Sequence, residues 1–597
     1  MTASPAPSTP VRVGARTVTQ VFRPYQRQFA LGVVWLLCTN ALALWIPRLL
    51  NEGVEGLRAG HGWTVMAVHG SWMAGTAALL AITRVLSRRC MFNVGRDVEY
   101  DMRRDFYAVL SLQPPVFFEK HPVGDLMSRA TNDLSNVRMM FGFALLNVIN
   151  TAAIYLGNIP LLLGLDARLA VAALAPYPLV FLAARRVAAR VFALTKQNQE
   201  DLSALSTRVQ EHLGGLQVVR AFAQEDAEQT RFDKASAAYY ASSVKLAVAR
   251  NLFGPVMGLL GTASALVAIW YGSVRVLDGA LTVGGLVEFN GRLAALAWPT
   301  LALGWLMAVW QRGKASFDRI NEVLAAAPSI TSPAAVVTPE HALGSVAFTQ
   351  VGVQRGDRWT LKDLNLTLPG RGFVGIVGTT GSGKTTLAML VPRLLDATVG
   401  TVAVDGVPVA QQDLSALRSN VAVAPQEAFL FSMSVLDNIR FGRPDASRDE
   451  VEALVDALAL RPDVLSFPQG LDTLVGERGI TLSGGQRQRV ALARALLTNP
   501  KVLILDDTVS AVDAETEEHI LDTLRGQEHQ RTLLVTSHRL SAVKNADEIL
   551  VLDAGAVVER GTHTGLLRAN GRYASLWGRE RVLAELERLD RAAVVSP

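Results

Sequence analysis

Residues Gly378 to Thr385 read GTTGSGKT and directly follow the apolar run Phe373 to Val377. This order predicts a buried strand, a glycine-rich loop and the start of a helix. In the pattern GxxxxGK[ST], the glycines allow successive backbone N–H groups to face phosphate oxygens. The ammonium group of Lys384 would reach the terminal phosphates, and the Thr385 hydroxyl would face Mg²⁺. The stretch therefore predicts a phosphate-binding loop and, around it, a P-loop α/β domain.

The predicted nucleotide-binding residues of this loop are consecutive. They are Gly378, Thr379, Thr380, Gly381, Ser382, Gly383, Lys384, Thr385 and Thr386. A helix that begins near Lys384 adds its positive N-terminal end to the site. The alternative is a glycine-rich turn that binds nothing, which the coincidence of strand, loop and helix disfavours. The loop alone does not identify the reaction, because kinases, GTPases, helicases and transporters all contain it.

The composition indicates a membrane protein with more than one domain. The chain has 597 residues, of which 50% are hydrophobic and 19% are charged. Such a length exceeds a single domain, and so large an apolar share indicates membrane segments. The formal charge of +5 is small for this length and argues against a nucleic-acid-binding groove. The two cysteines, Cys38 and Cys90, do not indicate a disulfide framework.

The N-terminal residues 1–28 are predicted to precede the membrane domain. Met1 to about Arg16 is rich in Pro, Ser, Thr and Ala and lacks an apolar core, so it resembles a disordered cytoplasmic tail and not a signal peptide. The segment Val18 to Gln28 has the pattern of a short amphipathic helix on the membrane surface.

Residues 29–324 are predicted to form an all-α transmembrane domain with six spans. The apolar stretches are Phe29–Leu50, Trp63–Val85, Met139–Leu163, Leu169–Leu182, Phe253–Val274 and Val283–Trp310. Most have the length of a membrane-spanning helix. The fourth is short, and it follows a tight polar turn at Gly164, Asp166 and Arg168. Tilting, or an extension through Val187, would complete this crossing.

Two long segments rich in Arg and Lys set the predicted orientation. They are Arg84–Arg138 and Arg185–Arg250, whereas the other connections are short and contain few basic residues. The positive-inside rule places these segments and both termini in the cytoplasm, and the protein in the cytoplasmic membrane as a multi-pass protein. Apolar residues recur within them at helical spacing, which predicts membrane helices that continue into the cytosol, with solvated loops as the alternative.

A predicted linker over 325–343, rich in Ala, Pro, Ser and Thr, separates the membrane domain from a soluble domain over 344–597. Short β-branched runs alternate with helical patterns in this second domain, which favours an α/β fold. The expected strands, besides Phe373–Val377, are Val402–Val404, Val421–Ala424, Val502–Leu505, Thr532–Val535 and Ile549–Leu552.

Two strand ends carry further candidate site residues. Val502 to Asp507 reads VLILDD, and in P-loop enzymes the first acid, here Asp506, holds the Mg²⁺ shell. The next strand ends in Thr536, Ser537 and His538, where His538 is a candidate sensor of the γ-phosphate. A structural role is the alternative for a single histidine.

Leu482 to Gln486 reads LSGGQ and leads into a helical pattern. Here the chain resembles the ATP-binding cassette (ABC) family, for which LSGGQ is the signature. The other family marks follow the expected order: Gln426 in APQEAFLF, Gly476 to Gly479 in VGERG, Ser510 to Asp513 in SAVD, and His538. The resemblance implies that Ser483, Gly484, Gly485 and Gln486 contact ATP. It also implies Mg²⁺ ligands at Thr385, Gln426 and Asp506, and catalytic roles for Asp507, His538 and Gln426.

The resemblance extends through the membrane half. The segment Phe117–Asp133, FFEKHPVGDLMSRATND, resembles the first coupling region of ABC exporters, and EHLGGLQVVRAFAQED from Glu211 resembles the second. Six spans in front of one cassette imply a half-transporter. Such a chain needs a second half-transporter, because the family holds each ATP between one chain's phosphate loop and the other chain's LSGGQ.

Two positions depart from the family pattern. The family has a general-base glutamate after the metal-binding aspartate, where this chain has Asp507, shorter by one methylene. This difference resembles the degenerate-site subunit of a heterodimeric exporter, with a conservative exchange as the alternative. The position that normally stacks on adenine corresponds to Arg355, whose guanidinium plane can also stack, or to Trp359 in a shifted register.

The expected function is ATP-driven export of amphipathic compounds, with membrane lipids and an amphipathic substrate as partners and no nucleic acid. Polar residues in the spans are the candidates for contact with cargo: Asn40, Asn147, Asn150, Glu288, Asn290 and Arg292. Glu288 and Arg292 are one helical turn apart, so they either pair with each other or line a cavity. A homodimeric lipid flippase, a peptide exporter and a non-catalytic regulatory subunit remain alternatives, whereas six spans argue against a soluble cassette ATPase.

Overall fold

The computed structural model describes residues 14–60, 62–476, 482–508, 512, 514–526 and 530–582. These residues form two compact units. The first contains the chain up to Ser111 together with Pro122–Ala327. The second contains Leu112–His121 together with the chain from Pro328 onwards. The short segment 112–121 therefore groups with the C-terminal unit, although both of its neighbours in sequence belong to the first.

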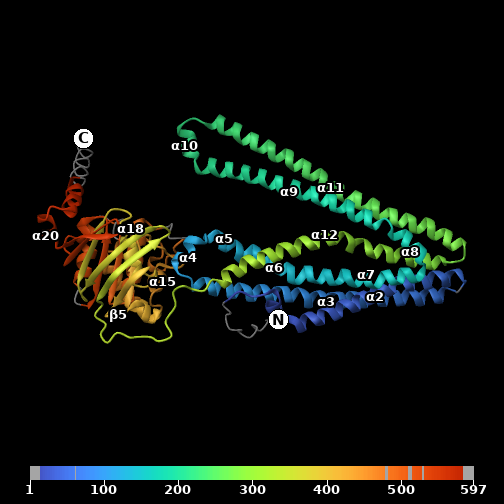
Figure 1. Ribbon diagram of the computed structural model, residues 1–597, viewed down its shortest axis with the longest axis horizontal. Helices are drawn as coiled ribbons and strands as arrows, with labels where there is room; N and C mark the ends of the chain where they lie inside the picture. Colours follow the sequence, from blue (N-terminus) through green and yellow to red (C-terminus); the bar gives the residue numbers. More distant parts are fainter. Residues whose placement is uncertain are drawn as a thin grey trace. The chain divides into compact units, whose positions relative to one another are not determined.

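The first unit is all helical (Figure 1). Its elements are α1 (Val18–Phe22), η1 (Arg23–Tyr25), α2 (Gln26–Arg58), α3 (Trp63–Ser111), α5 (Val123–Ser128), η2 (Arg129–Asp133), α6 (Leu134–Met139), η3 (Met140–Ala144), α7 (Leu145–Leu165), α8 (Ala167–Leu174), α9 (Tyr177–Gly214), α10 (Leu216–Ala221), α11 (Glu225–Leu277) and α12 (Val283–Ala325). The turns η2 and η3 are π-helical and continue the helix from α5 to α7.

Four helical stretches within the described residues are long and apolar enough to cross a membrane. They are Val18–Arg58, Met66–Ser111, Val123–Leu165 and Val283–Ala325. They contain the first, third and sixth predicted spans and all but the first three residues of the second. The fourth and fifth predicted spans overlap in part with shorter apolar stretches, Ala167–Leu179 and Thr262–Leu277. The fourth is further divided, because α8 ends at Leu174 and α9 begins at Tyr177 after Pro176.

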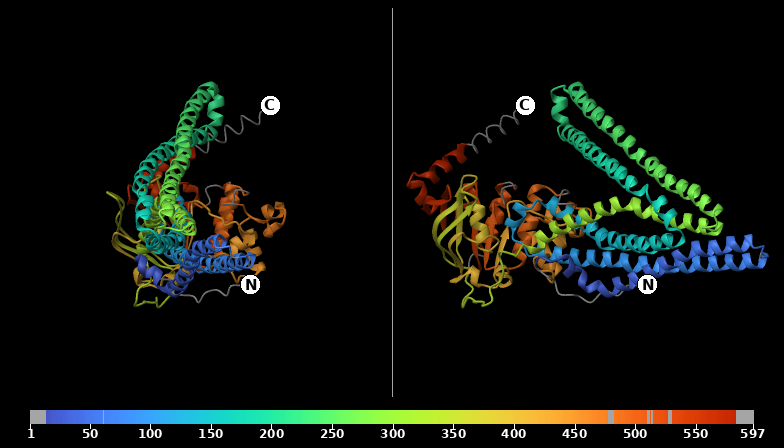
Figure 2. Two further views of the ribbon diagram at one scale, coloured as in Figure 1. Left: turned by 90° about the vertical axis from the view of Figure 1, so that its right-hand side faces the viewer. Right: turned by 45° about the vertical axis from the view of Figure 1, so that its right-hand side comes forward.

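The prediction that membrane helices continue beyond the spans is confirmed. Helix α3 extends without interruption to Ser111, and α9 and α11 extend together to α10. The views agree that α9 and α11 run side by side, with α10 at their tip (Figures 1 and 2). The second predicted coupling region therefore consists of the end of α9, the short helix α10 and the start of α11.

Small residues allow the membrane helices to approach closely, as is common where lipid provides no hydrophobic drive. A Cβ atom added at Gly95 of α3 would lie 2.7 Å from the carbonyl oxygen of Arg138 and 3.0 Å from the backbone nitrogen of Gly142. Nearby, the Ser87 hydroxyl of α3 donates to the carbonyl oxygen of Gly32 in α2 at 3.0 Å. Both cysteines are free, Cys38 exposed and Cys90 half-buried.

The polar turn before α8 is confirmed, and Asp166 organises it. One carboxylate oxygen accepts a hydrogen bond from the Leu169 backbone nitrogen at 3.0 Å and so caps α8. The other accepts from Arg275 Nε of α11 at 2.7 Å. The Asp166 side chain is only 4% exposed, so its charge depends on these partners.

The second unit contains two sheets. The first has the order β2-β1-β4-β5 and is antiparallel, and the second has the order β10-β9-β3-β8-β7-β6. Strands β9, β3, β8, β7 and β6 run parallel to one another, and β10 is antiparallel to β9. The strands are β1 (Val346–Arg355), β2 (Arg358–Leu368), β3 (Phe373–Gly378), β4 (Val399–Val404), β5 (Val407–Pro408), β6 (Val421–Ala424), β7 (Val502–Asp506), β8 (Thr532–Ser537), β9 (Glu548–Asp553) and β10 (Ala556–Gly561).

Short helices surround these sheets. They are α4 (Pro115–Lys120), α13 (Lys384–Leu390), α14 (Leu414–Asn420), α15 (Val435–Arg440), α16 (Arg448–Ala457), α17 (Arg461–Ser466), α18 (Gly484–Leu497), α19 (Ala514–Arg525) and α20 (His563–Arg568), with turns η4 (Val409–Gln411), η5 (Gly470–Asp472) and η8 (Leu540–Val543). All six predicted strands are confirmed. Strands β1, β2, β5 and β10 were not predicted. Polar residues interrupt β1, β2 and β10 at solvent-facing positions, and β5 has only two residues.

We expect Asp166→Ala to destabilise the first unit by about 2–4 kcal/mol, from a lost cap of ~1 kcal/mol and a lost charge-assisted hydrogen bond of ~1.5–3 kcal/mol. Thermal unfolding of the detergent-solubilised protein would show it as a lower midpoint. The control is Glu52→Ala, which removes an exposed pair with Arg48 and should cost under about 1 kcal/mol. Equal shifts for both variants would contradict the role given to Asp166.

Candidate functional site

The parallel register of three strands places the candidate site residues at one edge of the sheet. Strand β8 lies between β3 and β7, with Val377 paired to Ser537 and Asp506 paired to Thr536. The phosphate loop leaves the end of β3, and the two acids end β7. Ligands of open α/β sheets bind at the carboxyl ends of such strands, so this edge is where the sequence motifs converge.

The loop backbone requires its glycines. Gly381 and Gly383 have φ angles of 81° and 106°, a region that side chains with a Cβ atom rarely adopt. A Cβ atom at Gly383 would lie 2.7 Å from Leu361 Cδ2 and 2.9 Å from the Thr360 carbonyl oxygen. The Ser382 hydroxyl is buried and has no hydrogen-bond partner among the described residues. A phosphate oxygen would supply the partner that this hydroxyl lacks.

Lys384, the first residue of α13, folds back over the loop. Its Nζ donates to the carbonyl oxygens of Gly378 at 2.8 Å and Thr379 at 3.1 Å. Burial lowers the pKa of Lys384, and the carboxylates of Asp507 and Asp506 partly oppose this shift. The ammonium group is thus incompletely solvated, and a polyphosphate would stabilise its charged form.

The three predicted Mg²⁺ ligands supply a hydroxyl, a carboxylate and an amide. Thr385 Oγ1 donates to Asp506 Oδ1 at 3.2 Å. Gln426 Nε2 donates to Asp507 at 3.2 Å, which leaves the amide oxygen of Gln426 available. Hard oxygen donors of this kind suit Mg²⁺, which also takes ligands from water and substrate phosphates. The residues therefore fit the ion, which when bound would neutralise charge on the β- and γ-phosphates.

The predicted catalytic residues are in contact with one another. The Nδ1–H group of His538 donates to the Asp507 carboxylate, 2.8 Å from Oδ1 and 2.9 Å from Oδ2. Gln426 contacts the same carboxylate. The backbone nitrogen of Asp507 donates to the Thr536 carbonyl oxygen at 2.9 Å. Asp507 is buried, and its side chain is fixed between His538 and Gln426. These two contacts therefore set the position of its carboxylate oxygens.

The LSGGQ segment forms the N-terminus of α18. The Ser483 hydroxyl accepts from the Gln486 backbone nitrogen at 3.2 Å, and the Gln486 side chain accepts from the Ser483 backbone nitrogen at 2.8 Å. This capping box fixes the helix start and leaves Ser483 exposed. Gly484 and Gly485 are the first residues of the helix. Within the described chain no hydrogen bond joins this segment to the phosphate loop.

Asp463 was not predicted and holds the LSGGQ helix in place. One of its carboxylate oxygens accepts from Gln486 Nε2 at 2.8 Å, and the other lies 2.8 Å from Arg489 Nη2.

Thr536 was named only as a strand end, yet its hydroxyl donates to Asp506 Oδ1 at 2.6 Å and is fully buried. A polar side chain at the end of an otherwise apolar strand is the sequence signal for such a residue.

Arg355 ends β1 and forms an ion pair at 3.1 Å with Glu119 of α4, within the second unit. The Trp359 ring lies over the backbone of Gly352. A Cβ atom added at Gly352 would lie 2.8 Å from this ring. The adenine contact of Arg355 remains a prediction.

The VGERG motif residues 477–479 and the SAVD residues 510, 511 and 513 lie outside the described residues.

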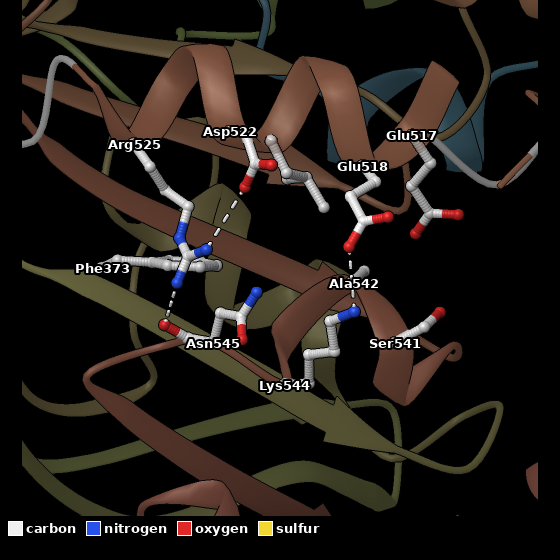
Figure 3. Close-up of a pocket in the computed structure, with 10 residues that line it drawn as sticks. Phe373, Glu517, Glu518, Asp522, Arg525, Ser541, Ala542, Lys544 and Asn545 are labelled. Atoms are coloured by element: carbon white, nitrogen blue, oxygen red, sulfur yellow. Dashed lines mark hydrogen bonds and ion pairs between the residues drawn. The ribbon is translucent and has the colours of Figure 1, made fainter. Parts of the chain in front are cut away.

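A pocket of about 120 Å³ lies elsewhere in the second unit, between α19 and η8 (Figure 3). The Arg525 guanidinium lies over the Phe373 ring, and Lys544 pairs with Glu518 at 3.0 Å (Figure 3). Phe373 begins β3, whereas the phosphate loop follows the other end of this strand. This pocket is therefore separate from the nucleotide site.

Comparisons with known proteins agree with these two units. The model of the ABC transporter transmembrane region matches residues 29–300, and the ABC transporter model matches residues 361–510. A solved structure of a bacterial Atm1-family ABC exporter with ATP bound superimposes with a TM-score of 0.77 at 28% identity, covering 93% of this chain and 99% of that one.

Curated relatives match over nearly the full length. YheI of Bacillus subtilis, a probable multidrug resistance ABC transporter ATP-binding/permease protein, is 35% identical over 95% of this chain and 97% of its own. The multidrug resistance-like ATP-binding protein MdlA of Escherichia coli is 34% identical over 95% and 96%. An ATP-dependent lipid A-core flippase of Methylococcus capsulatus is 32% identical over 96% of both chains.

We expect Thr536→Val to weaken Mg²⁺-dependent ATP binding by about tenfold, because a hydrogen bond to a carboxylate contributes ~1.5–3 kcal/mol and Asp506 would lose one buried donor. Titration of ATP with and without Mg²⁺ measures the effect. The control is Thr523→Val, a half-buried residue of α19 whose hydroxyl donates to the His519 carbonyl oxygen, outside the site. An equal loss of metal-free ATP binding would contradict an orienting role toward Asp506.

Proposed function

The chain belongs to the ABC transporter family, with an exporter-type membrane domain fused to an ATPase domain, and from this premise we propose that it is one half of a dimeric exporter. ATP binding and hydrolysis would move amphipathic small molecules or lipids out of the cytoplasm. The protein would lie in the cytoplasmic membrane, with its N-terminus and ATPase domain on the cytoplasmic side, as the basic segments between its spans suggest.

The observation that carries this proposal is the cluster at the end of β7. Asp506 contacts Thr385 of the phosphate loop, and Asp507 contacts Gln426 and His538. A metal-binding acid, a second acid and a histidine beside a phosphate loop are the parts that ATP hydrolysis requires. Their presence in a chain with membrane-spanning helices supports the coupling of hydrolysis to transport.

Two features support a second subunit. The Ser483–Gln486 segment has an exposed serine at a capped helix N-terminus, which suits a phosphate of an ATP held by another chain. Around α10, the side chains of Leu213, Val218 and Phe222 are exposed although large and apolar. An apolar helix end beyond the membrane is suited to contact with another protein domain.

We propose further that the partner is a different half-transporter and that this chain's own site hydrolyses ATP slowly. The shorter Asp507 side chain already forms hydrogen bonds with His538 and Gln426, so a water beside the γ-phosphate would lie farther from it than from a glutamate. General-base catalysis contributes ~10²- to 10⁴-fold when the geometry is correct. The intact LSGGQ segment would then complete the faster site of the partner.

A homodimeric lipid flippase is the second candidate. It is favoured by similarity to the lipid A-core flippases, of which the Methylococcus capsulatus protein matches over 96% of this chain. In that case two equivalent sites with Asp507 would both turn over. A peptide exporter has the same architecture, and a regulatory subunit would contribute neither its phosphate loop nor its LSGGQ segment.

When two copies of the purified chain pair, the LSGGQ segment of each completes the site of the other, and we expect Asp507→Glu to raise the ATPase rate of this pair by at least about tenfold, since it restores the missing methylene of a general base. Release of inorganic phosphate by the full-length protein in nanodiscs measures this. Asp445→Glu, an exposed exchange outside the site, should change nothing. High activity of the unaltered chain alone, with no gain in Asp507→Glu, would refute the slow site.

In the complex with its partner, we expect Ser483→Arg to reduce transport far more than Lys384→Ala, because only the first change reaches the faster site. Vesicle uptake of a fluorescent amphipath measures both variants. Equal and severe losses would support two equivalent sites, as in a homodimer. Full transport by both variants would indicate a regulatory subunit.

A further inference from the structure

A pocket of about 270 Å³ with both polar and apolar lining residues lies within the first unit, between α2, α3, α7 and α12. Its lining includes four asparagines, Asn40, Asn147, Asn150 and Asn158, and two arginines, Arg84 and Arg88. Polar and ionisable side chains at membrane depth are costly and usually functional. The structure thus gathers three predicted polar residues, Asn40, Asn147 and Asn150, into one cavity.

Of the two roles predicted for Glu288 and Arg292, pairing with each other or lining a cavity, the structure shows the pairing. Arg292 Nε donates to Glu288 at 2.8 Å, Asn51 donates to the same glutamate at 2.7 Å, and both charged side chains are buried. They pair with each other and tie α12 to α2. They are not among the residues that line the pocket.

Arg84 and Arg88 lie one helical turn apart on α3, and both are exposed. Neither forms a hydrogen bond or ion pair with any described residue, whereas Arg103 and Arg138, farther along the chain, both pair with Glu99. Like charges at this spacing destabilise a helix slightly. Two unpaired guanidinium groups on a pocket wall provide a site for a carboxylate or phosphate, which arginine binds through several N–H groups.

The asparagines offer acceptors for a ligand. The side-chain nitrogens of Asn147 and Asn158 donate to the carbonyl oxygens of Phe143 and Ile154, four residues earlier in their own helix. Asn40 donates to Leu36 and to Asn150. The amide oxygens of Asn147 and Asn158 accept no hydrogen bond within the described chain, so they are available to hydroxyl or amine groups of a ligand.

The pocket has a charged end and an apolar end. Arg88 marks the charged end. Met91, one helical turn after Arg88 on α3, packs against Leu36 and Leu146 there. Farther along α2, Leu44 lies against Gly157 of α7, and Pro47 also lines the cavity. Trp298 of α12, which is 76% exposed, adds an aromatic face to the wall. A molecule that fills the pocket would be charged at one end and apolar at the other.

We propose that this pocket binds an anionic amphipathic molecule whose phosphate or carboxylate contacts Arg84 and Arg88, whose hydroxyl or amine groups contact Asn147 and Asn158, and whose apolar part lies against Leu44 and Trp298. This inference rests on the proposed export function and specifies its substrate class. The anion is carried either by a membrane lipid or by a soluble amphipath.

The test measures binding of octyl glucoside 6-phosphate to the full-length protein in zwitterionic nanodiscs by calorimetry without nucleotide. Unphosphorylated octyl glucoside and octyltrimethylammonium are the comparison probes. We expect the phosphorylated probe to bind at least about tenfold more tightly than either, and the double change Arg84→Gln with Arg88→Gln to abolish this preference. Each single change should weaken binding by a smaller factor, which keeps the test valid if the double variant does not fold.

The matched control is Arg89→Gln, which removes a neighbouring exposed arginine that is not part of the pocket lining. It should leave the affinity within about twofold. If Arg89→Gln weakens binding as much as Arg84→Gln or Arg88→Gln, the arginines act only as a general basic surface near lipid head groups, and the proposal is overturned. Unchanged affinity in the single and double variants also overturns it.

A second arm identifies the source of the anion. Phosphatidylglycerol added to the nanodiscs should compete with the probe in the unaltered protein if the site takes lipid, and should not compete if it takes soluble amphipaths. Probe binding is measured without ATP. A loss of probe binding is therefore distinct from a loss of ATP-driven export. A protein that binds the probe but neither hydrolyses ATP nor transports would retain the pocket and lose only the proposed function.

Discussion

The ATPase unit depends on one buried carboxylate. Asp506 ends β7 and accepts hydrogen bonds from Thr536 on the adjacent strand and from Thr385 at the start of α13. These contacts are possible because β3, β8 and β7 are parallel neighbours whose carboxyl ends coincide. The acid thereby joins the phosphate loop to the sheet. Because the Asp506 carboxylate is buried, its charge lies in a medium of low dielectric constant. Its attraction to a divalent cation is therefore strong.

Around this carboxylate the chain holds the parts of two incomplete sites. The phosphate loop, Asp507 and His538 form one group, and the capped end of α18 forms another that no hydrogen bond connects to the first within the described residues. A helix N-terminus attracts phosphate through its unpaired N–H groups and its dipole. The exposed end of α18 at Ser483 is therefore suited to a nucleotide held by a second chain.

The membrane unit combines close packing with a polar interior. Glycines such as Gly95 bring backbones into contact, and van der Waals packing replaces the hydrophobic effect that lipid cannot provide. Two classes of charged residue in this unit differ in their surroundings. Glu288 with Arg292 and Asp166 with Arg275 are paired and structural, whereas Arg84 and Arg88 are unpaired and line a cavity. The first class stabilises the bundle, and the second is free to recognise cargo.

The sequence by itself determined the family, the helical and α/β halves, the strands of the parallel sheet, and the residues of the phosphate loop. These features follow from local patterns, because a strand, a loop and a helix start are encoded by adjacent residues. It did not reveal the division of the fourth span at Pro176, the pairing of Arg355 with Glu119, or the roles of Thr536 and Asp463. Only the tertiary structure showed that Arg84, Arg88 and four asparagines share one pocket, because residues on α2, α3, α7 and α12 meet through helix packing, which depends on contacts between residues distant in the chain.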